Sequence, residues 1–189
     1  MRIVESTTGV PKTASNLKQR VDAALNAALG ETVRKSSAGP EEVIKRIGEG
    51  SYEHTNFRFF LAPRIVEILD GMEGVGKVRQ AWVHSIDVTE SDPSAADKAG
   101  DGSPCDWSMG LVLPLIAKVD GKNKSQAKAV DTLNGLLVAA LHERRVEVVD
   151  DYLRVNFVTA EEIAAGRGEA ARIRNPYNPA TEISFEKPP

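Results

Sequence analysis

The spacing of apolar residues changes twice between residues 107 and 158, and these changes predict the fold class. Across 107–119 apolar side chains recur at every second position, which is the period of a β-strand. Across 125–142 they recur every three or four residues, as on one face of a helix. Period two returns at 146–150 and 152–158, where we expect a hairpin. This order predicts an α+β fold with a small mixed or antiparallel sheet packed on helices.

Further elements are expected before this region. An apolar stripe at helical spacing runs through 14–29, and a strand-like alternation runs through 77–88. A short helix is expected to begin at Pro40, because proline is tolerated in the first turn, and the same rule predicts a helix over 63–71 that begins with proline. The apolar run 57–61 fits a buried strand and also a helix that the proline kinks, so both interpretations stay open.

Two features describe the organisation of the chain. Pro114 has no N–H to give to a sheet ladder, so the strand that contains it is expected to lie at an edge or to carry a bulge there. The polar loop 91–104 is longer than the usual connections of about 4–6 residues. We expect one domain over 1–174, followed by an irregular C-terminal tail, 175–189, that contains four prolines.

The composition narrows the function classes without naming one. The chain has 189 residues and a net charge of −3. This charge does not suit a protein that covers phosphates with Lys and Arg, so nucleic acid is not an expected partner. The single cysteine, Cys105, allows no disulfide within one chain and points to a reducing cytoplasm. We find no secretory signal and no apolar run near the roughly 20 residues that span a bilayer, so no membrane partner is expected.

Acidic residues gather on and around the loop 91–104, and carboxylates at strand ends can hold Mg²⁺ or Ca²⁺. These residues are Asp87, Glu90, Asp92, Asp97, Asp101 and Asp106. Their spacing differs from the Asp-x-Asp-x-Asp-Gly series of a calcium-binding hand. We interpret 87–106 as a solvated acidic loop, and whether it binds a metal stays open.

The predicted order of helix, strand, strand, helix and strand resembles the core of PD-(D/E)xK nucleases. That family uses a carboxylate on one strand, then a carboxylate and a lysine two residues apart on the next, to bind metal and activate water. In this chain Asp106 precedes the predicted strand and Lys118 lies on it, but the position two before Lys118 is Ile116. Without the second carboxylate a two-carboxylate metal site cannot form there. Lys118 is therefore expected to be an outward strand residue, and the nuclease is kept as an alternative with a degenerate motif.

The other reactive side chains are not expected to come together in one site. A metal site or a catalytic triad needs partners for His54, His84 or His142, and His84 and Asp87 have opposite parity on one strand. Cys105 is interpreted as a loop residue without a role. A late basic cluster is interpreted as a solvated face, although with Tyr177 it has the chemistry to touch nucleic acid; it comprises Arg167, Arg172 and Arg174. We predict no catalytic, cofactor-binding or metal-binding residue and no cofactor.

The predicted strand from Trp107 to Leu115 and the helix over 125–141 carry a resemblance to tail-terminator and head–tail completion proteins of long-tailed phages. Residues 17–29 followed by 77–157 are similar to the order of elements in that family, while 40–76 is an addition that small members lack. The resemblance implies a non-enzymatic structural subunit of a homo-oligomeric assembly in the host cytoplasm or virion. Its partners are then copies of itself and other assembly proteins. A small-molecule binding domain remains a further alternative.

Overall fold

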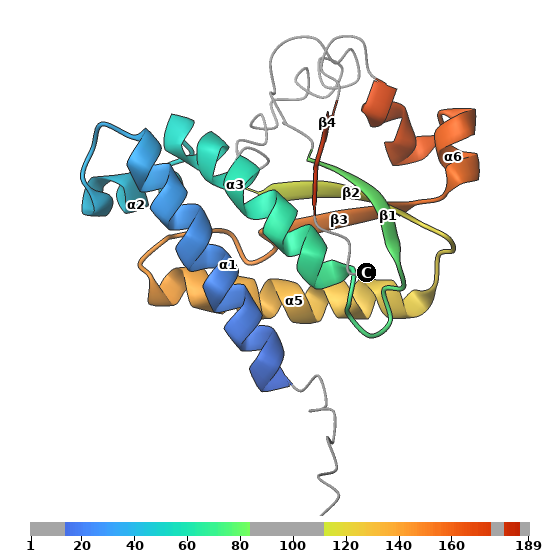
Figure 1. Cartoon of the computed structure of the whole chain (residues 1–189), viewed down its shortest axis with the longest axis horizontal. Coiled ribbons are helices and arrows are strands. Elements are labelled where there is room, and N and C mark those ends of the chain that lie inside the picture. The colour runs from blue at the N-terminus through green and yellow to red at the C-terminus, as the bar shows by residue number, and fades with distance from the viewer. Residues whose placement is uncertain (1–13, 84–111, 175–179, 186–189) are drawn as a thin grey trace, which may run out of the picture.

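The computed structural model describes residues 14–83, 112–174 and 180–185. These residues form helices around a mixed four-stranded sheet, which confirms the α+β fold class (Figure 1). The predictions made for 91–104 and for the flanking ends of the strands at 77–88 and 107–119 lie outside the described residues.

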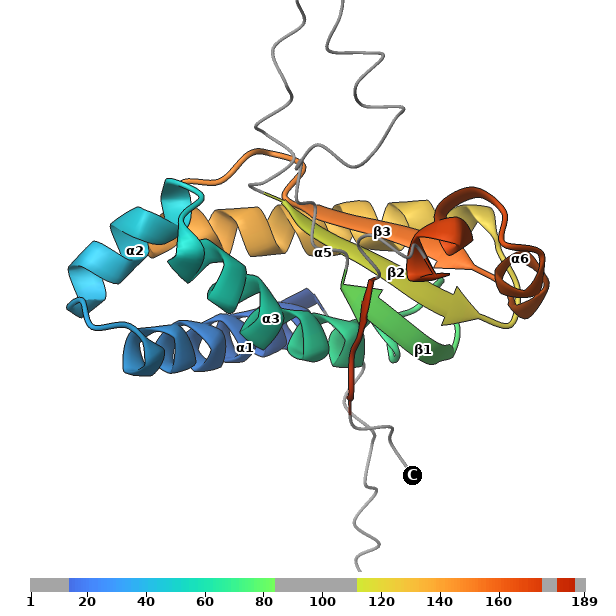
Figure 2. The same ribbon diagram turned by 90° about the horizontal axis from the view of Figure 1, so that it is seen from above.

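In the described part of the chain, three helices precede the sheet. Helix α1 (Ala14–Lys35) extends the predicted helix at 14–29 by about a turn and a half, and α2 (Pro40–Gly48) begins at its proline as expected. Helix α3 (Tyr52–Leu69) follows after a short turn. Figure 2 shows α1 and α3 lying side by side, and their apolar stripes meet in one core.

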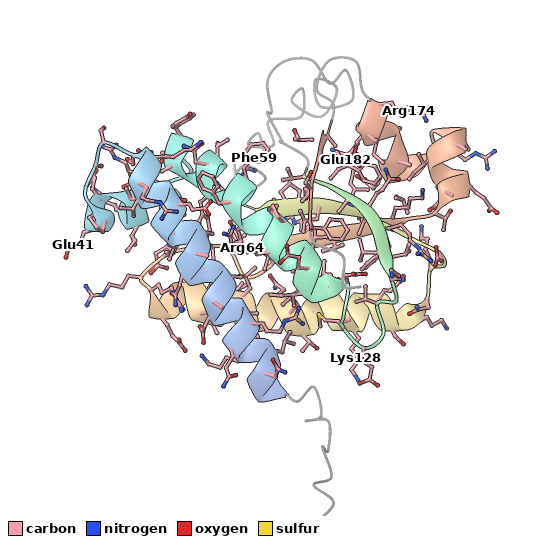
Figure 3. The ribbon with its side chains drawn as sticks, viewed as in Figure 1. Glu41, Phe59, Arg64, Lys128, Arg174 and Glu182 are labelled. Atoms are coloured by element: carbon pink, nitrogen blue, oxygen red, sulfur yellow. The ribbon has the colours of Figure 1, made fainter. Side chains whose placement is uncertain are left out.

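Helix α3 begins eleven residues before Pro63 (63 − 52 = 11), so the helix predicted over 63–71 was placed too late. The run 57–61 is helical, which settles the alternative left open by the sequence. A series of buried apolar side chains at helical spacing crosses the proline and keeps both halves packed against the core: Phe57, Leu61, Ile65 and Leu69. Arg64 Nη1 donates to the carbonyl oxygen of Phe60 at 2.7 Å, next to the point where the proline removes a backbone donor (Figure 3).

The sheet has the strand order β3-β2-β1-β4. Strand β1 (Val78–Val83) is antiparallel to both β2 (Leu113–Val119) and the short β4 (Thr181–Glu182). Strand β3 (Leu153–Val158) is parallel to β2, because helix α5 (Lys124–Glu143) returns the chain along the sheet between them. The predicted helix at 125–142 and the strand at 152–158 are thus confirmed.

The strand predicted at 146–150, and with it the hairpin, is wrong. Residues 146–149 have no regular structure, and Val146 is fully buried as part of the core. Its burial explains the apolar signal without a strand. The chain then enters β3 beside the first residue of β2, where Leu113 N donates to the carbonyl oxygen of Tyr152 at 2.6 Å. This bond starts a parallel ladder, so the partner of β3 is distant in sequence rather than adjacent.

Strand β2 lies inside the sheet, so the expectation that Pro114 marks an edge strand is also wrong. Amide groups of successive strand residues face opposite sides, and Leu113 N faces β3. The nitrogen of Pro114 therefore faces β1, beyond the last described pair, Val83 with Leu115. The irregularity in the described β1–β2 pairing lies between Val78 and Gln80, and the alternative expectation of a bulge at Pro114 stays a prediction because the chain after Val83 lies outside the described residues.

Both faces of the sheet are covered. Helices α1, α3 and α5 bury the face that carries Leu113 and Leu115. The opposite face carries Trp82 and Ile116. It is covered by α6 (Ala160–Ala165) and by the 3-10 helix η2 (Gly168–Arg174), from which Ala170 packs against these side chains. Strand β2, which alternates in sequence between an apolar face and a mixed face, is therefore buried on both faces.

The C-terminal segment 175–189, expected to be irregular, contributes strand β4 to the sheet. Ala180 and Ile183, which flank this strand, are buried against opposite sides of the sheet. Ile183 N also donates to the carbonyl oxygen of Ala81 at 2.9 Å. These contacts tie residues 180–183 to the domain that was expected to end at residue 174.

Two helix caps illustrate how local sequence sets the boundaries. Thr159 and Glu162 form a capping box at the start of α6, with the Thr159 hydroxyl accepting from Glu162 N and the Glu162 carboxylate accepting from Thr159 N. The cap of α5 is Asn123. Its side-chain oxygen accepts from the backbone N–H groups of Ser125 and Gln126.

Candidate functional site

A groove of ≈ 410 Å³ runs between α5 and β3. Its apolar lining comes from Val130 on the helix and from Val155 and Phe157 on the strand, and both strand side chains are half-buried. Exposed polar side chains surround this lining: Lys122, Asn123, Asp131 and Asn156. The groove therefore combines an apolar floor with a charged rim at the outer margin of the sheet.

Strand β3 has a strand neighbour on only one side within the part of the chain that the structure describes. Because Leu113 N bonds to Tyr152 O, residues of the Tyr152 parity face β2 and those of the Leu153 parity face outward. The outward backbone groups of Val155 and Phe157 have no bonding partner among the described residues. Unpaired groups of this kind are a template for pairing with another strand.

Asn134 on α5 closes the first part of this edge. Its Oδ1 accepts from Leu153 N at 2.8 Å, and its Nδ2 donates to the carbonyl oxygen of Asp150 at 2.7 Å. One amide side chain thus satisfies two backbone groups of the segment that enters β3. Among the described residues, the outward N–H groups of β3 that remain without a partner are consequently those of Val155 and Phe157.

A buried polar cluster lies on the other side of β3. His54 Nε2 is 3.3 Å from the hydroxyl oxygen of Tyr152, and Arg58 Nη1 donates to the carbonyl oxygen of Val112 at 3.3 Å. All three side chains are buried, and burial raises the pKa of the Tyr152 phenol well above its usual range. The neutral phenol and the cation of Arg58 hold α3 against the starts of β2 and β3.

Sequence reasoning considered His54 only as an isolated histidine and missed Arg58 and Tyr152. A signal was present, because His54 and Arg58 are four residues apart and continue the apolar face of α3 that includes Phe57 and Leu61. Polar residues on a buried helical face require buried partners. Neither described groove includes any of the three side chains, so the cluster has the features of a structural contact.

Glu53 organises the corner between α2 and α3. Its carboxylate accepts from Ser51 Oγ at 2.9 Å, from Arg46 Nη1 at 3.0 Å and from Ser36 Oγ at 3.2 Å. These donors, chiefly Ser51 and then Arg46, lower the pKa of Glu53 from 4.5 to about 2. The carboxylate is fully engaged by structural donors and is not available as a base.

The structure does not assemble the nuclease motif in the residues that it describes. Ile116 is buried in the second core, and Lys118 is half-buried, with Nζ donating to Gln80 Oε1 at 3.2 Å. Gln80 Nε2 in turn donates to Glu182 Oε1 at 3.2 Å, so this row of polar side chains runs across β2, β1 and β4. Asp106, the other acidic candidates from Asp87 to Asp101, Cys105 and His84 lie outside the described residues.

The basic cluster on η2 lies at the surface. Arg172 Nε forms an ion pair with Glu169 at 2.7 Å, and Arg167 and Arg174 are exposed (Figure 3). His142 is exposed at the end of α5. Tyr177 lies outside the described residues. These placements agree with the interpretation of the basic residues as a solvated face.

A second groove of ≈ 280 Å³ lies between α1 and α3. Two arginines that line it are already engaged: Arg20 Nη2 donates to the carbonyl oxygen of Glu67 at 3.2 Å, and Arg64 Nη2 pairs with Glu31 at 3.0 Å. The cations therefore brace the two helices against each other, which leaves the α5–β3 groove as the stronger candidate site.

Across residues 14–83, 112–174 and 180–185, no group of three or more His, Cys, Asp or Glu side chains is placed to hold a metal ion. In the same residues no helix combines the length and the apolarity that crossing a bilayer requires. Comparison of the chain with protein-family models, with curated proteins and with solved structures finds no match.

Proposed function

We propose that the chain is a non-enzymatic structural subunit of a homo-oligomeric assembly. The observation that carries the proposal is the open edge of β3 beside the α5–β3 groove. Unpaired backbone groups at Val155 and Phe157 supply directional bonds, and the adjoining apolar side chains supply surface to bury. A surface of this kind suits association better than turnover of a substrate.

The polar side chains of the described residues support the same proposal. The strongest clusters, around Tyr152 and around Glu53, are engaged in contacts that hold elements of the fold together. A catalytic group needs access to a substrate, and it needs a proton or a lone pair that structural contacts do not already occupy. Neither cluster contributes a side chain to the two grooves described above, so interface burial is the favoured mechanism.

The assembly that we propose is a tail or head–tail connection component of a phage, located in the host cytoplasm or the virion. Its support is the order of α1, β1, β2, α5 and β3, which is similar to that of tail-terminator and head–tail completion proteins. Helices α2 and α3 are the additional part of this chain. Other assembly proteins are the further partners that this proposal implies.

Light scattering of the purified chain over a range of concentrations tests the proposal. We expect a mass that rises above the 20.4 kDa of one chain. A single-chain mass at every concentration, together with no binding to a preformed assembly of partner proteins, would contradict the proposal. The Tyr52→Ser variant, which alters an aromatic side chain 75% exposed on α3, is a control that should associate like the wild type.

A nuclease assay separates this proposal from its main alternative. The chain is mixed with DNA and Mg²⁺ or Mn²⁺, and cleavage is compared with that of the Asp106→Asn and Lys118→Ala variants. We expect no metal-dependent cleavage by the wild type. Cleavage that both substitutions abolish would reclassify the protein as a catalyst of the PD-(D/E)xK type. A rise in melting temperature with a small metabolite would instead favour the binding-domain alternative.

A further inference from the structure

We infer that β3 pairs antiparallel with β3 of a second copy, around a twofold axis at Asn156. The inference rests on the proposed homo-oligomeric function and names the surface through which two copies join. It follows from three properties of the described residues: which backbone groups are free, which side chains stand beside them, and how charge is distributed along the rim of the groove.

The free backbone groups select a single register. In an antiparallel ladder, two directly opposed residues exchange both of their N–H···O bonds, and such pairs recur every second residue. Pairing Val155 with the partner's Phe157, and Phe157 with the partner's Val155, satisfies all the outward N–H and C=O groups of both residues. The twofold axis then passes between Asn156 and the partner's Asn156.

Neighbouring registers would break contacts that the fold already makes. A twofold axis at Val155 would pair Phe157 with the partner's Leu153, whose N–H is bonded to Asn134. An axis at Phe157 would pair Val155 with the partner's Thr159, whose N–H is bonded to Glu162 in the capping box of α6. Asn134 and the capping box thus limit the free N–H donors of this edge to the two residues that the register at Asn156 uses.

The side chains in this register are also complementary. Val155 lies beside the partner's Phe157 on the face that lines the groove, and aromatic with β-branched neighbours are favourable cross-strand pairs. On the other face, the amide of Asn156 meets the partner's Asn156 at a position where opposed residues approach closely. Each amide has a donor and an acceptor for the other.

Charge along the rim matches the same symmetry. Helix α5 runs opposite to β3, so Lys122 lies toward Phe157, while Asp131 lies toward Val155, one turn before Asn134 and its contact with Leu153. Pairing Phe157 with the partner's Val155 therefore brings Lys122 toward the partner's Asp131, and the axis repeats this pair. Asp131 has no ion pair among the described residues, while Lys122 is half-exposed and bonds Glu162 at 2.8 Å.

These features favour a second copy over an unrelated extended peptide. A peptide would satisfy the backbone groups of Val155 and Phe157 equally well, but nothing in the groove specifies its charges. Self-association matches Lys122 with Asp131 twice and closes the edge, and twofold dimers are the commonest closed assemblies of identical chains. The dimer is then the unit from which a larger assembly is built.

A charge exchange tests the register. We expect Lys122→Asp and Asp131→Lys, each alone, to raise the dimer dissociation constant about tenfold, since each places like charges together at two symmetry-related sites. The chain carrying both substitutions restores opposite charges and should return to within about threefold of wild-type affinity. Dissociation constants come from sedimentation velocity, and melting temperatures establish that every variant is folded.

A cross-link tests the axis. In a Cys105→Ser background, Asn156→Cys places two thiols across the axis at a separation suited to a disulfide, so mild oxidation should link most chains in pairs. Glu49→Cys, in an exposed position at the end of α2, is the matched control and should not link. A wild-type chain that never associates would contradict the proposed function itself. A chain that associates without the charge rescue and without the cross-link would overturn only this interface.

Discussion

The imidazole Nε2 of His54 lies 3.3 Å from the phenolic oxygen of Tyr152, although 98 residues separate the two in sequence. Their rings are tilted by 56° with centroids 6.0 Å apart, and both side chains are buried. The contact joins the first turns of α3 to the residue that precedes β3. Because a buried polar group without a partner is costly, this pair specifies how α3 is positioned on the sheet.

Replacing Tyr152 with Phe should lower the free energy of unfolding by about 1–2 kcal/mol, because the ring is retained while the hydrogen bond with His54 is lost. Urea denaturation at pH 7, with an unchanged m-value, measures the effect. The matched control is Tyr52→Phe, which alters the exposed tyrosine of α3 and should leave stability unchanged within about 0.5 kcal/mol. Equal losses in the two variants would contradict a special role for the buried pair.

The same phenol should make the protein sensitive to alkali. Burial raises the pKa of Tyr152 in the folded state above its unfolded value of 10.0, so the folded chain holds this proton more tightly than the unfolded chain. Tyr152 therefore makes its full contribution to the free energy of unfolding below about pH 10, and this contribution is lost as the pH rises above that value. We expect the urea midpoint of the wild type to fall between pH 9.5 and about 11.5, and that of Tyr152→Phe to fall less.

Glu53 should produce the opposite dependence at low pH. Its pKa is lowered in the folded state from 4.5 to about 2 by donors from Ser51 and Arg46, so the unfolded chain binds the proton more tightly. Its contribution to stability is complete above pH 4.5 and is lost as the pH falls toward about 2. The urea midpoint of the wild type should therefore drop over this window.

The variant Glu53→Gln should be less stable than the wild type at pH 7 and should show a shallower drop between pH 4.5 and 2. Glu49→Gln is the control, because this carboxylate is exposed and its ion pair with Lys45 spans 3.9 Å. Its profile should follow that of the wild type. A Glu53→Gln profile parallel to the wild type would show that other carboxylates set the acid sensitivity.

The sequence pattern located the elements whose periodicity is continuous and local. The apolar stripes of α1 and α5 and the alternation of β1 and β2 identify which face of each element is buried, and Pro40 marks the start of α2 through local sterics. Pro63 suggested a helix start because proline is sterically unfavourable inside a helix. The core contacts of Phe57 and Ile65 on either side of it outweigh that local cost.

Features that depend on distant partners were not predictable from spacing. Whether Val146 belongs to a strand or to a loop that packs in the core depends on where α5 returns the chain. In either structure the valine is buried, so its apolar side chain does not distinguish the two. The candidate site has the same character. Val155 and Phe157 look like ordinary strand residues until the order of the sheet shows that their outer side is open.

Asn134 provides a test of how the edge of β3 is limited. Asn134→Ala removes both the acceptor of Leu153 N and the donor to Asp150 O, and should cost about 1–3 kcal/mol of unfolding free energy. Asn134→Asp keeps the acceptor of Leu153 N but turns a carboxylate oxygen toward the carbonyl oxygen of Asp150, so it should also be less stable than the wild type. Thr132→Ala, which removes an exposed hydroxyl bonded only within α5, is the control and should be nearly neutral. Hydrogen exchange of Leu153 N–H should accelerate in Asn134→Ala and not in the control.

Three glycines in helices offer a graded test of the packing around α1, α2 and α5. A Cβ added at Gly30 or Gly135 would meet no atom within 4 Å, so Gly30→Ala and Gly135→Ala should each raise the free energy of unfolding by about 1 kcal/mol through helix propensity. At Gly48 the added Cβ would stand 3.2 Å from the carbonyl oxygen of Glu147. Gly48→Ala should therefore gain less than the other two or lose stability, and a gain equal to theirs would show that the loop after α5 does not pack against the end of α2.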